Sequence, residues 1–278
     1  MSEKLIREGR FGAPKTFKTG SVVGTYPRPL LVFNCDEEGY SIFPSRTEKV
    51  RPDHLPFEVF SEDIKVVKSD ELAAMCKLPP ASLPPVTVLE VVDLVKQRLM
   101  SETYHPIANS GPLNDFVKAV NLLVQAGCPW RTVVVDSVTG LNEIILSHVA
   151  AVNNAALADA RKWAPMAGSK VQQCIGVLTS LPAHVVCIFH ESYKENELTQ
   201  ETRVAPLVYS QVRDRIGGLF SQWFYQFKQN GQPKVRTTDF ALIKGVGVRW
   251  PSGLPDVVGP TFKDIYGATL NENTNRPA

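Results

Sequence analysis

Short runs of consecutive apolar residues, each ending in polar side chains, recur along the chain. The clearest are Leu30–Phe33 before Asn34, Val133–Val135 before Asp136, and Val185–Phe189 before His190. Runs without polar alternation are typical of strands buried on both faces of a parallel sheet. Further strands are expected at residues 4–11, 57–60, 64–67, 223–228 and 240–243, the last two around a turn at Asn230-Gly231.

Between these runs, apolar residues recur at helical spacing. Leu113–Ala126 has this pattern and Gly127 is a natural stop for it. Two more helices are expected at 141–163 and 170–181, and a short one before Pro27. The alternation of strands and helices predicts an α/β fold, with a mostly parallel central sheet and helices on both faces. We expect one domain over residues 1–270 and a polar tail at 271–278.

The composition changes this picture little. Hydrophobic residues make up 44% and charged residues 21% of the 278 positions, as expected for a globular protein with a proper core. No stretch approaches the roughly 20 apolar residues that span a bilayer, and the first residues lack the apolar core of a signal peptide. The five scattered cysteines are expected to be reduced thiols. A cytoplasmic protein is therefore expected.

Positive charge gathers in the C-terminal third. Residues 203–249 hold eight basic residues against Asp214 and Asp239, a local charge of +6 in a chain whose net charge is +2. Such asymmetry favours a polyanionic partner, either nucleotide phosphate or nucleic acid. The alternative is chance clustering on a solvated face.

A candidate phosphate-binding loop follows the first expected strand. The template is G-x-x-x-x-G-K-[ST] between a strand and a helix. Its eight positions are filled here by Gly12, Ala13, Pro14, Lys15, Thr16, Phe17, Lys18 and Thr19. Backbone N–H groups of such a loop surround phosphates, the lysine reaches the β- and γ-phosphates, and the hydroxyl binds Mg²⁺. Phe17 departs from the template, because glycine is expected there.

Asp136 ends the Val133–Val135 run, at the edge of the sheet where parallel α/β proteins bind ligands. An aspartate here is expected to hold Mg²⁺ together with Thr19, as in P-loop NTPases. The alternative is that Asp136 caps the next helix.

Polar residues also follow two other strands. Asp36-Glu37-Glu38 follows the strand at 30–33, and Glu37 or Glu38 is the candidate general base that polarises the attacking water. His190, with Glu191, ends the strand at 184–189 and is a candidate sensor of the γ-phosphate. The alternatives are a solvated acidic loop and a structural histidine.

Lys244 and Arg249 follow the last expected strand. Cations at this place could reach the nucleotide of a neighbouring subunit and stabilise charge in the transition state. The alternative is a pair of solvated surface cations.

In this order, the features resemble the phage nucleotide-binding, RecA-like P-loop ATPases. The resembling segments are 12–19, 29–39, 132–137, 184–191 and Lys244 near Arg249, which together reach over roughly residues 4–266. The resemblance implies a RecA-type core that binds ATP and Mg²⁺ and hydrolyses ATP, with stimulation by DNA. It also implies single-stranded DNA as a partner, in phage recombination or replication within a bacterial host cell.

The same resemblance implies Lys18 and Thr19 as phosphate and Mg²⁺ contacts, Asp136 as the Walker B carboxylate and His190 as the γ-phosphate sensor. Lys244 and Arg249 are spaced more widely than the close Lys/Arg pair of RecA-like assemblies. A homo-oligomer is expected, with a single-strand annealing or single-strand-binding protein as a possible further partner.

The sequence therefore predicts an ATPase that acts on single-stranded DNA, with the loop after Glu191 ordering against the DNA through Tyr193, Lys194 and Arg203. Two alternatives remain open. One is a P-loop small-molecule kinase or phosphotransferase, with Arg203, Arg213 and Arg215 in its lid. The other is an interaction module that binds ATP without hydrolysing it.

Overall fold

The computed structural model describes residues 4–36, 64–91, 110–153, 160–195, 202–208, 210–213, 215–249 and 251–267. Within these ranges, eleven strands form one sheet with the order β11-β9-β8-β1-β6-β5-β2-β4-β3, while β10 pairs with β8 and β7 with β6. The strands are β1 (Arg7–Gly12), β2 (Leu30–Asn34), β3 (Ile64–Val67), β4 (Val86–Glu90), β5 (Thr132–Asp136), β6 (His184–Glu195), β7 (Thr202–Pro206), β8 (Gln222–Gln229), β9 (Gln232–Arg236), β10 (Gly247–Val248) and β11 (Val257–Val258).

The central strands run parallel. The pairs β3–β4, β4–β2, β2–β5, β5–β6, β6–β1 and β1–β8 are all parallel, and antiparallel pairing is confined to β7, β9, β10 and β11. Strand β6 lies between β1 and β5, so the carboxyl ends of β1, β6, β5 and β2 meet at one edge. The predicted α/β class with a mostly parallel sheet is confirmed.

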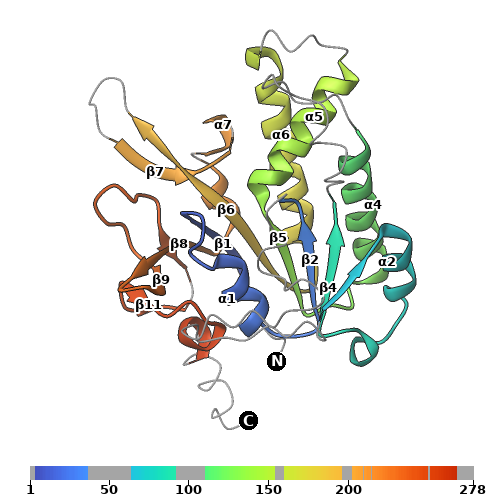
Figure 1. The fold of residues 1–278 in the computed structure, drawn as a ribbon, viewed down its shortest axis with the longest axis horizontal. Helices are drawn as coiled ribbons and strands as arrows, with labels where there is room; N and C mark the ends of the chain where they lie inside the picture. Colours follow the sequence, from blue (N-terminus) through green and yellow to red (C-terminus); the bar gives the residue numbers. More distant parts are fainter. Residues whose placement is uncertain are drawn as a thin grey trace.

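Helices cover both faces of the sheet (Figure 1). They are α1 (Lys18–Thr25), α2 (Ser69–Met75), α4 (Gly111–Ala126), α5 (Val138–Val152), α6 (Ala160–Thr179) and α7 (Ser210–Arg213), with the 3₁₀ turns η3 (Pro80–Ser82) and η4 (Ile216–Leu219). The larger core joins the sheet to α4, α5 and α6, as in the contact of Phe33 with Phe116. The smaller core joins the other face to α1 and to Tyr266 near the C-terminus.

The strands β2 and β5 form where their apolar runs predicted them, and β6 continues beyond its run to Glu195. Each is buried because neighbours pair on both sides and helices pack above and below. Strands β4, β7, β9, β10 and β11 were not predicted. Strand β4 follows a proline-rich stretch, and β9 is a short hairpin partner that turns back at Asn230-Gly231. The loop expected after Glu191 is instead a hairpin, because residues 191–195 of β6 pair with β7.

Two expectations about elements are wrong. The helix expected at 141–163 ends at Val152, because Asn153 caps it with backbone and side-chain hydrogen bonds to the Val149 carbonyl, and α6 begins at Ala160 with Pro165 inside it. Residues 240–243 form a turn, because Phe240 and Ile243 hydrogen-bond each other's backbone. The strand expected at 57–60 lies outside the described residues.

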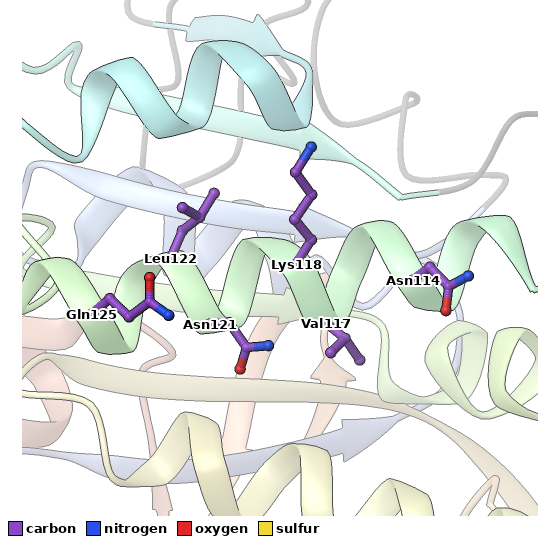
Figure 2. Close-up of a pocket in the computed structure, with 6 residues that line it drawn as sticks. All are labelled: Asn114, Val117, Lys118, Asn121, Leu122 and Gln125. Carbon is purple, nitrogen blue, oxygen red and sulfur yellow. The ribbon is translucent and has the colours of Figure 1, made fainter.

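The helices and the surface of α4 also bear on the sequence predictions. None of the helices in the described ranges is long and apolar enough to cross a membrane. The outward face of α4 bears a shallow cavity of about 380 Å³ (Figure 2), lined by Asn114, Val117, Lys118, Asn121, Leu122 and Gln125. No sequence-predicted site residue lines this cavity.

Candidate nucleotide-binding site

The predicted phosphate loop joins the end of β1 to the start of α1. Gly12 is the last residue of β1 and Lys18 the first of α1, so residues 13–17 curve at the carboxyl edge of the sheet, directly before a helix N-terminus. Gly12 has a φ of 154°, and a Cβ there would lie 2.0 Å from the Gln226 carbonyl oxygen of β8. The loop therefore requires glycine at its first position, because the backbone of the adjacent strand β8 lies too close for a Cβ.

Lys18 turns its side chain back along this loop. Its ammonium donates hydrogen bonds to the carbonyl oxygens of Gly12 and Ala13, each at 2.8 Å. Burial lowers the pKa of Lys18 to about 8, while the carboxylates of Asp136 and Glu191 favour its charged form. The cation therefore sits at the loop, surrounded by acidic groups from two other strand ends.

Thr19 and Asp136 meet at the same edge. The Thr19 hydroxyl donates a hydrogen bond of 2.7 Å to Asp136 Oδ2, although 117 positions separate the two residues. The pKa of Asp136 is raised to about 6, first by burial and then by the Asp36 carboxylate, while the Thr19 hydrogen bond and Lys18 lower it. The sheet thus brings together the phosphate loop and the carboxylate at the end of β5.

This donor set fits a magnesium ion bound together with nucleotide phosphates. Mg²⁺ prefers oxygen ligands and is commonly held by one or two carboxylates plus phosphate oxygens and water. The Thr19 hydroxyl and the Asp136 carboxylate are such oxygens, already 2.7 Å apart. A divalent cation would also relieve the unfavourable burial of the Asp136 charge, so the chemistry of the residues present agrees with the predicted ligand.

A second carboxylate, Asp36 at the end of β2, links three strand ends. Its Oδ2 lies 2.7 Å from His190 Nε2 of β6, and its Oδ1 accepts a hydrogen bond of 2.8 Å from the Ser137 hydroxyl. Ser137 also caps α5 through the Gly140 N–H. Asp36 and His190 therefore lie beside the Thr19–Asp136 pair. Of the predicted acidic segment, Glu37 and Glu38 lie outside the described residues.

A comparison with known families gives this arrangement a class. A family model described as an AAA domain matches residues 82–239, more than half of the chain. The chain belongs to the AAA domain family. No curated protein matches it. The matched range contains Asp136 and His190 but begins after the phosphate loop, so the assignment of residues 12–19 rests on the geometry described above.

The AAA domain also has a polar contact within β6, at the point where β6 begins to pair with β7, that the sequence did not indicate. Glu191 accepts a hydrogen bond of 2.9 Å from the Tyr225 hydroxyl of β8 and one of 3.3 Å from the Tyr193 hydroxyl. Tyr225 is 34 positions away from Glu191 in the sequence, and Tyr193 is exposed. No sequence motif identifies either tyrosine as a partner of Glu191. Glu191 is thereby held next to the phosphate loop, where its charge acts on Lys18.

Of the cations Lys244 and Arg249, the second lies apart from this site. The Arg249 N–H donates to the Ser221 carbonyl just before β8, at the sheet edge opposite the phosphate loop. Lys244 follows Ile243, which bridges to Val204 of β7, and none of the contacts described for this part of the chain joins Lys244 to the Thr19–Asp136 pair.

A closer pair of cations lies on β9, which the sequence analysis did not predict as a strand. Lys234 and Arg236 are two residues apart, so their side chains share one face of the strand. The Arg236 guanidinium stands 4.0 Å from the ring centroid of Phe240 and 5.6 Å from that of Phe227. Alternation around the buried Val235 was the signal that could have identified this pair.

Proposed function

We propose that this AAA domain binds ATP with Mg²⁺ at the phosphate loop and hydrolyses it in a process on single-stranded DNA. The observation that carries the proposal is the 2.7 Å hydrogen bond between the Thr19 hydroxyl and Asp136. It joins the two halves of a P-loop site, the loop after β1 and the acidic end of β5, at one sheet edge. Membership of the AAA domain family supports nucleotide binding independently.

Each residue at the loop has a definite task in binding. Lys18 exchanges its bonds to the Gly12 and Ala13 carbonyls for the β- and γ-phosphates, and the N-terminus of α1 adds its N–H groups. Thr19 and Asp136 would hold the Mg²⁺, which when bound would neutralise charge on the phosphates. The burial of Asp136 and Lys18 strengthens these interactions because little water competes for them.

For hydrolysis, the acidic segment 36–38 supplies the general base. A carboxylate there accepts a proton from water as the water oxygen bonds to the γ-phosphorus, and the bond between that phosphorus and the bridging oxygen of ADP breaks. The bonds of Asp36 to His190 and Ser137 support this role, and Glu37 and Glu38 follow it in the chain. In this proposal His190 bonds the γ-phosphate and so reports its presence to the β6–β7 hairpin.

Assembly into a homo-oligomer would place cations of one subunit at the nucleotide of the next. Lys234 and Arg236 on β9 suit this role, because they share a face and Arg236 is held between two aromatic rings. Lys244 and Arg249 are the other candidates. All four belong to the basic C-terminal third of the chain.

The hairpin of β6 and β7 is the proposed contact with single-stranded DNA. Tyr193 on β6 is 68% exposed, and Arg203 on β7 is also exposed. Exposed aromatic rings stack on bases and cations bind phosphates, without need of a particular sequence. The hairpin begins at His190 and Glu191, so nucleotide and DNA would act on the same strand. We propose a role in phage recombination or replication, beside a single-strand annealing or single-strand-binding protein.

The test is the rate of ATP hydrolysis with and without a thymidine oligonucleotide, measured together with the mass of the assembled species. We expect stimulation by DNA in the wild type and loss of turnover in Lys18→Ala. Lys118→Ala, which changes an exposed lysine on α4, is the matched control and should behave as the wild type.

The outcomes separate the alternatives. Unchanged turnover in Lys18→Ala would remove the phosphate loop from the mechanism. Turnover without any response to DNA would leave the nucleotide site and reject the DNA partner. In a parallel assay with added small-molecule phosphoryl acceptors, formation of ADP without inorganic phosphate would instead favour the kinase alternative. Binding of ATP without turnover would favour the interaction module.

A further inference from the structure

Gln226 on β8 lies buried beneath the phosphate loop and hydrogen-bonds it directly. Its side chain has no exposed surface. The amide nitrogen donates a hydrogen bond of 2.7 Å to the carbonyl oxygen of Thr16, in the middle of the loop. The amide oxygen accepts one of 2.9 Å from the Arg10 guanidinium. A single side chain thus connects the loop to the core of the protein.

Arg10 fixes which way the Gln226 amide points. A guanidinium can only donate hydrogen bonds, so the Gln226 oxygen must face Arg10 and its NH₂ group must face Thr16. Arg10 is itself immobile, because it is fully buried and bonds Glu8 at 2.7 Å and the Tyr26 hydroxyl at 2.8 Å. The donor offered to the loop is therefore fixed in place and in direction.

The hydrogen bond to Thr16 also orients the next N–H group. In a trans peptide unit the C=O and the following N–H point in opposite directions. Because the Thr16 carbonyl points at Gln226, the N–H of Phe17 points away from it. Phosphate loops bind their ligand with backbone N–H groups of this kind.

Phe17 makes this support necessary. Its φ of 63° and ψ of 34° lie in the left-handed region, which glycine adopts freely and a residue with a Cβ adopts at a cost. Phe17 stands where the phosphate-loop template has glycine. The loop therefore needs a contact that favours the left-handed conformation at Phe17.

We propose that Gln226 is a positioning residue that keeps the phosphate loop in its binding conformation despite Phe17. The inference rests on the proposed nucleotide site. Gln226 holds the Thr16 carbonyl, and its own backbone oxygen packs under Gly12, where a Cβ would approach to 2.0 Å. The loop is thus held at two points by one residue of β8.

The experiment is a double-mutant cycle on the affinity for ATP with Mg²⁺, measured by titration calorimetry. Gln226→Leu should weaken binding about tenfold, because the Thr16 carbonyl loses its buried partner. In the background of Phe17→Gly, where the left-handed conformation needs no support, the same substitution should weaken binding less than about threefold. Gln226→Glu keeps an acceptor for Arg10 but has no donor for Thr16, so it should weaken ATP binding to a similar extent. It replaces Gln226→Leu in the cycle if that variant fails to fold.

Gln222→Leu is the matched control. Gln222 is also buried on β8, on the same face as Gln226, but it pairs with Glu8 and Val248 at the far end of the strand. It should leave ATP affinity unchanged even if it lowers thermal stability. The inference would be overturned if Gln226→Leu lowered the affinity for ATP equally in the wild type and in the Phe17→Gly background, or if it lowered the affinity in neither. Absence of ATP binding by the wild type would instead reject the proposed function.

Discussion

The hydroxyl of Thr19 donates a hydrogen bond to the carboxylate of Asp136, which joins the first helix of the chain to the end of a strand near its middle. The contact exists because β1 and β5 are both parallel to β6, which lies between them. Parallel strands place their carboxyl ends at one edge, so residues far apart in the sequence become neighbours there.

Replacement of Asp136 by asparagine should remove the effect of magnesium on nucleotide binding. The amide keeps the size of the side chain but has no charge for the cation. We expect Mg²⁺ to tighten ATP binding at least about tenfold in the wild type and less than about twofold in Asp136→Asn. Titrations in EDTA should give similar affinities for the two proteins. Asp70→Asn, which changes an exposed carboxylate, serves as the control. A full magnesium effect in Asp136→Asn would place the ion elsewhere.

The affinity for ATP with Mg²⁺ should be highest between about pH 6 and pH 8. Below the raised pKa of Asp136, about 6, the carboxyl group is protonated and cannot hold the cation. Above the lowered pKa of Lys18, about 8, the amine is neutral and loses its attraction for phosphate. Affinity should fall toward about tenfold per pH unit outside this window. Asp136→Asn should keep only the part of the acidic decline that comes from the titration of ATP itself. An unchanged acidic decline in that variant would contradict the assignment.

His190→Gln should lower the rate of hydrolysis more than the binding of ATP. His190 holds Asp36 at 2.7 Å, and a misplaced carboxylate is a poor general base. We expect kcat to fall about a hundredfold with KM changed less than about threefold, in the range usual for general acid–base groups. His148→Gln, at the half-buried contact of α5 with Ser110, is the control. A rise in KM with kcat intact would assign His190 to binding alone.

Arg10→Met should destabilise the protein strongly. The substitution leaves the fully buried Glu8 carboxylate without its cation, which typically costs about 3–5 kcal/mol in the free energy of unfolding. Lys118→Met breaks the exposed pair with Asp70 and should cost less than about 1 kcal/mol. Denaturant unfolding of both variants measures the difference. Costs of similar size would show that the buried pair has no special importance for stability.

The sequence predicted the parts of the fold that local pattern determines. Strands β2 and β5 were recognisable because both faces are buried, which leaves uninterrupted apolar runs. The end of α5 was not, since it depends on the side chain of Asn153 rather than on periodicity. The turn at 240–243 is closed by hydrogen bonds between Phe240 and Ile243 and is joined to β7 through Ile243, and the apolar pattern that predicted a strand there shows neither contact.

At the candidate site, too, local motifs could be predicted from the sequence and long-range contacts could not. The loop and Asp136 were found because each belongs to a motif with a fixed place at a strand end. The links of Asp36 to His190 and of Gln226 to Thr16 join residues 154 and 210 positions apart. Such partners can be identified only once the strand order is known, because spacing along the chain says nothing about them.

Strand β1, which leads into the phosphate loop, is hydrogen-bonded on one face by the last described residues of the chain. The Pro260 carbonyl accepts a hydrogen bond of 3.1 Å from Arg10, and the Tyr266 hydroxyl donates one of 2.6 Å to Glu8. During synthesis, residues 7–19 leave the ribosome long before these partners exist. A growing chain therefore cannot finish the support beneath this loop until Tyr266 has emerged, 258 positions after Glu8.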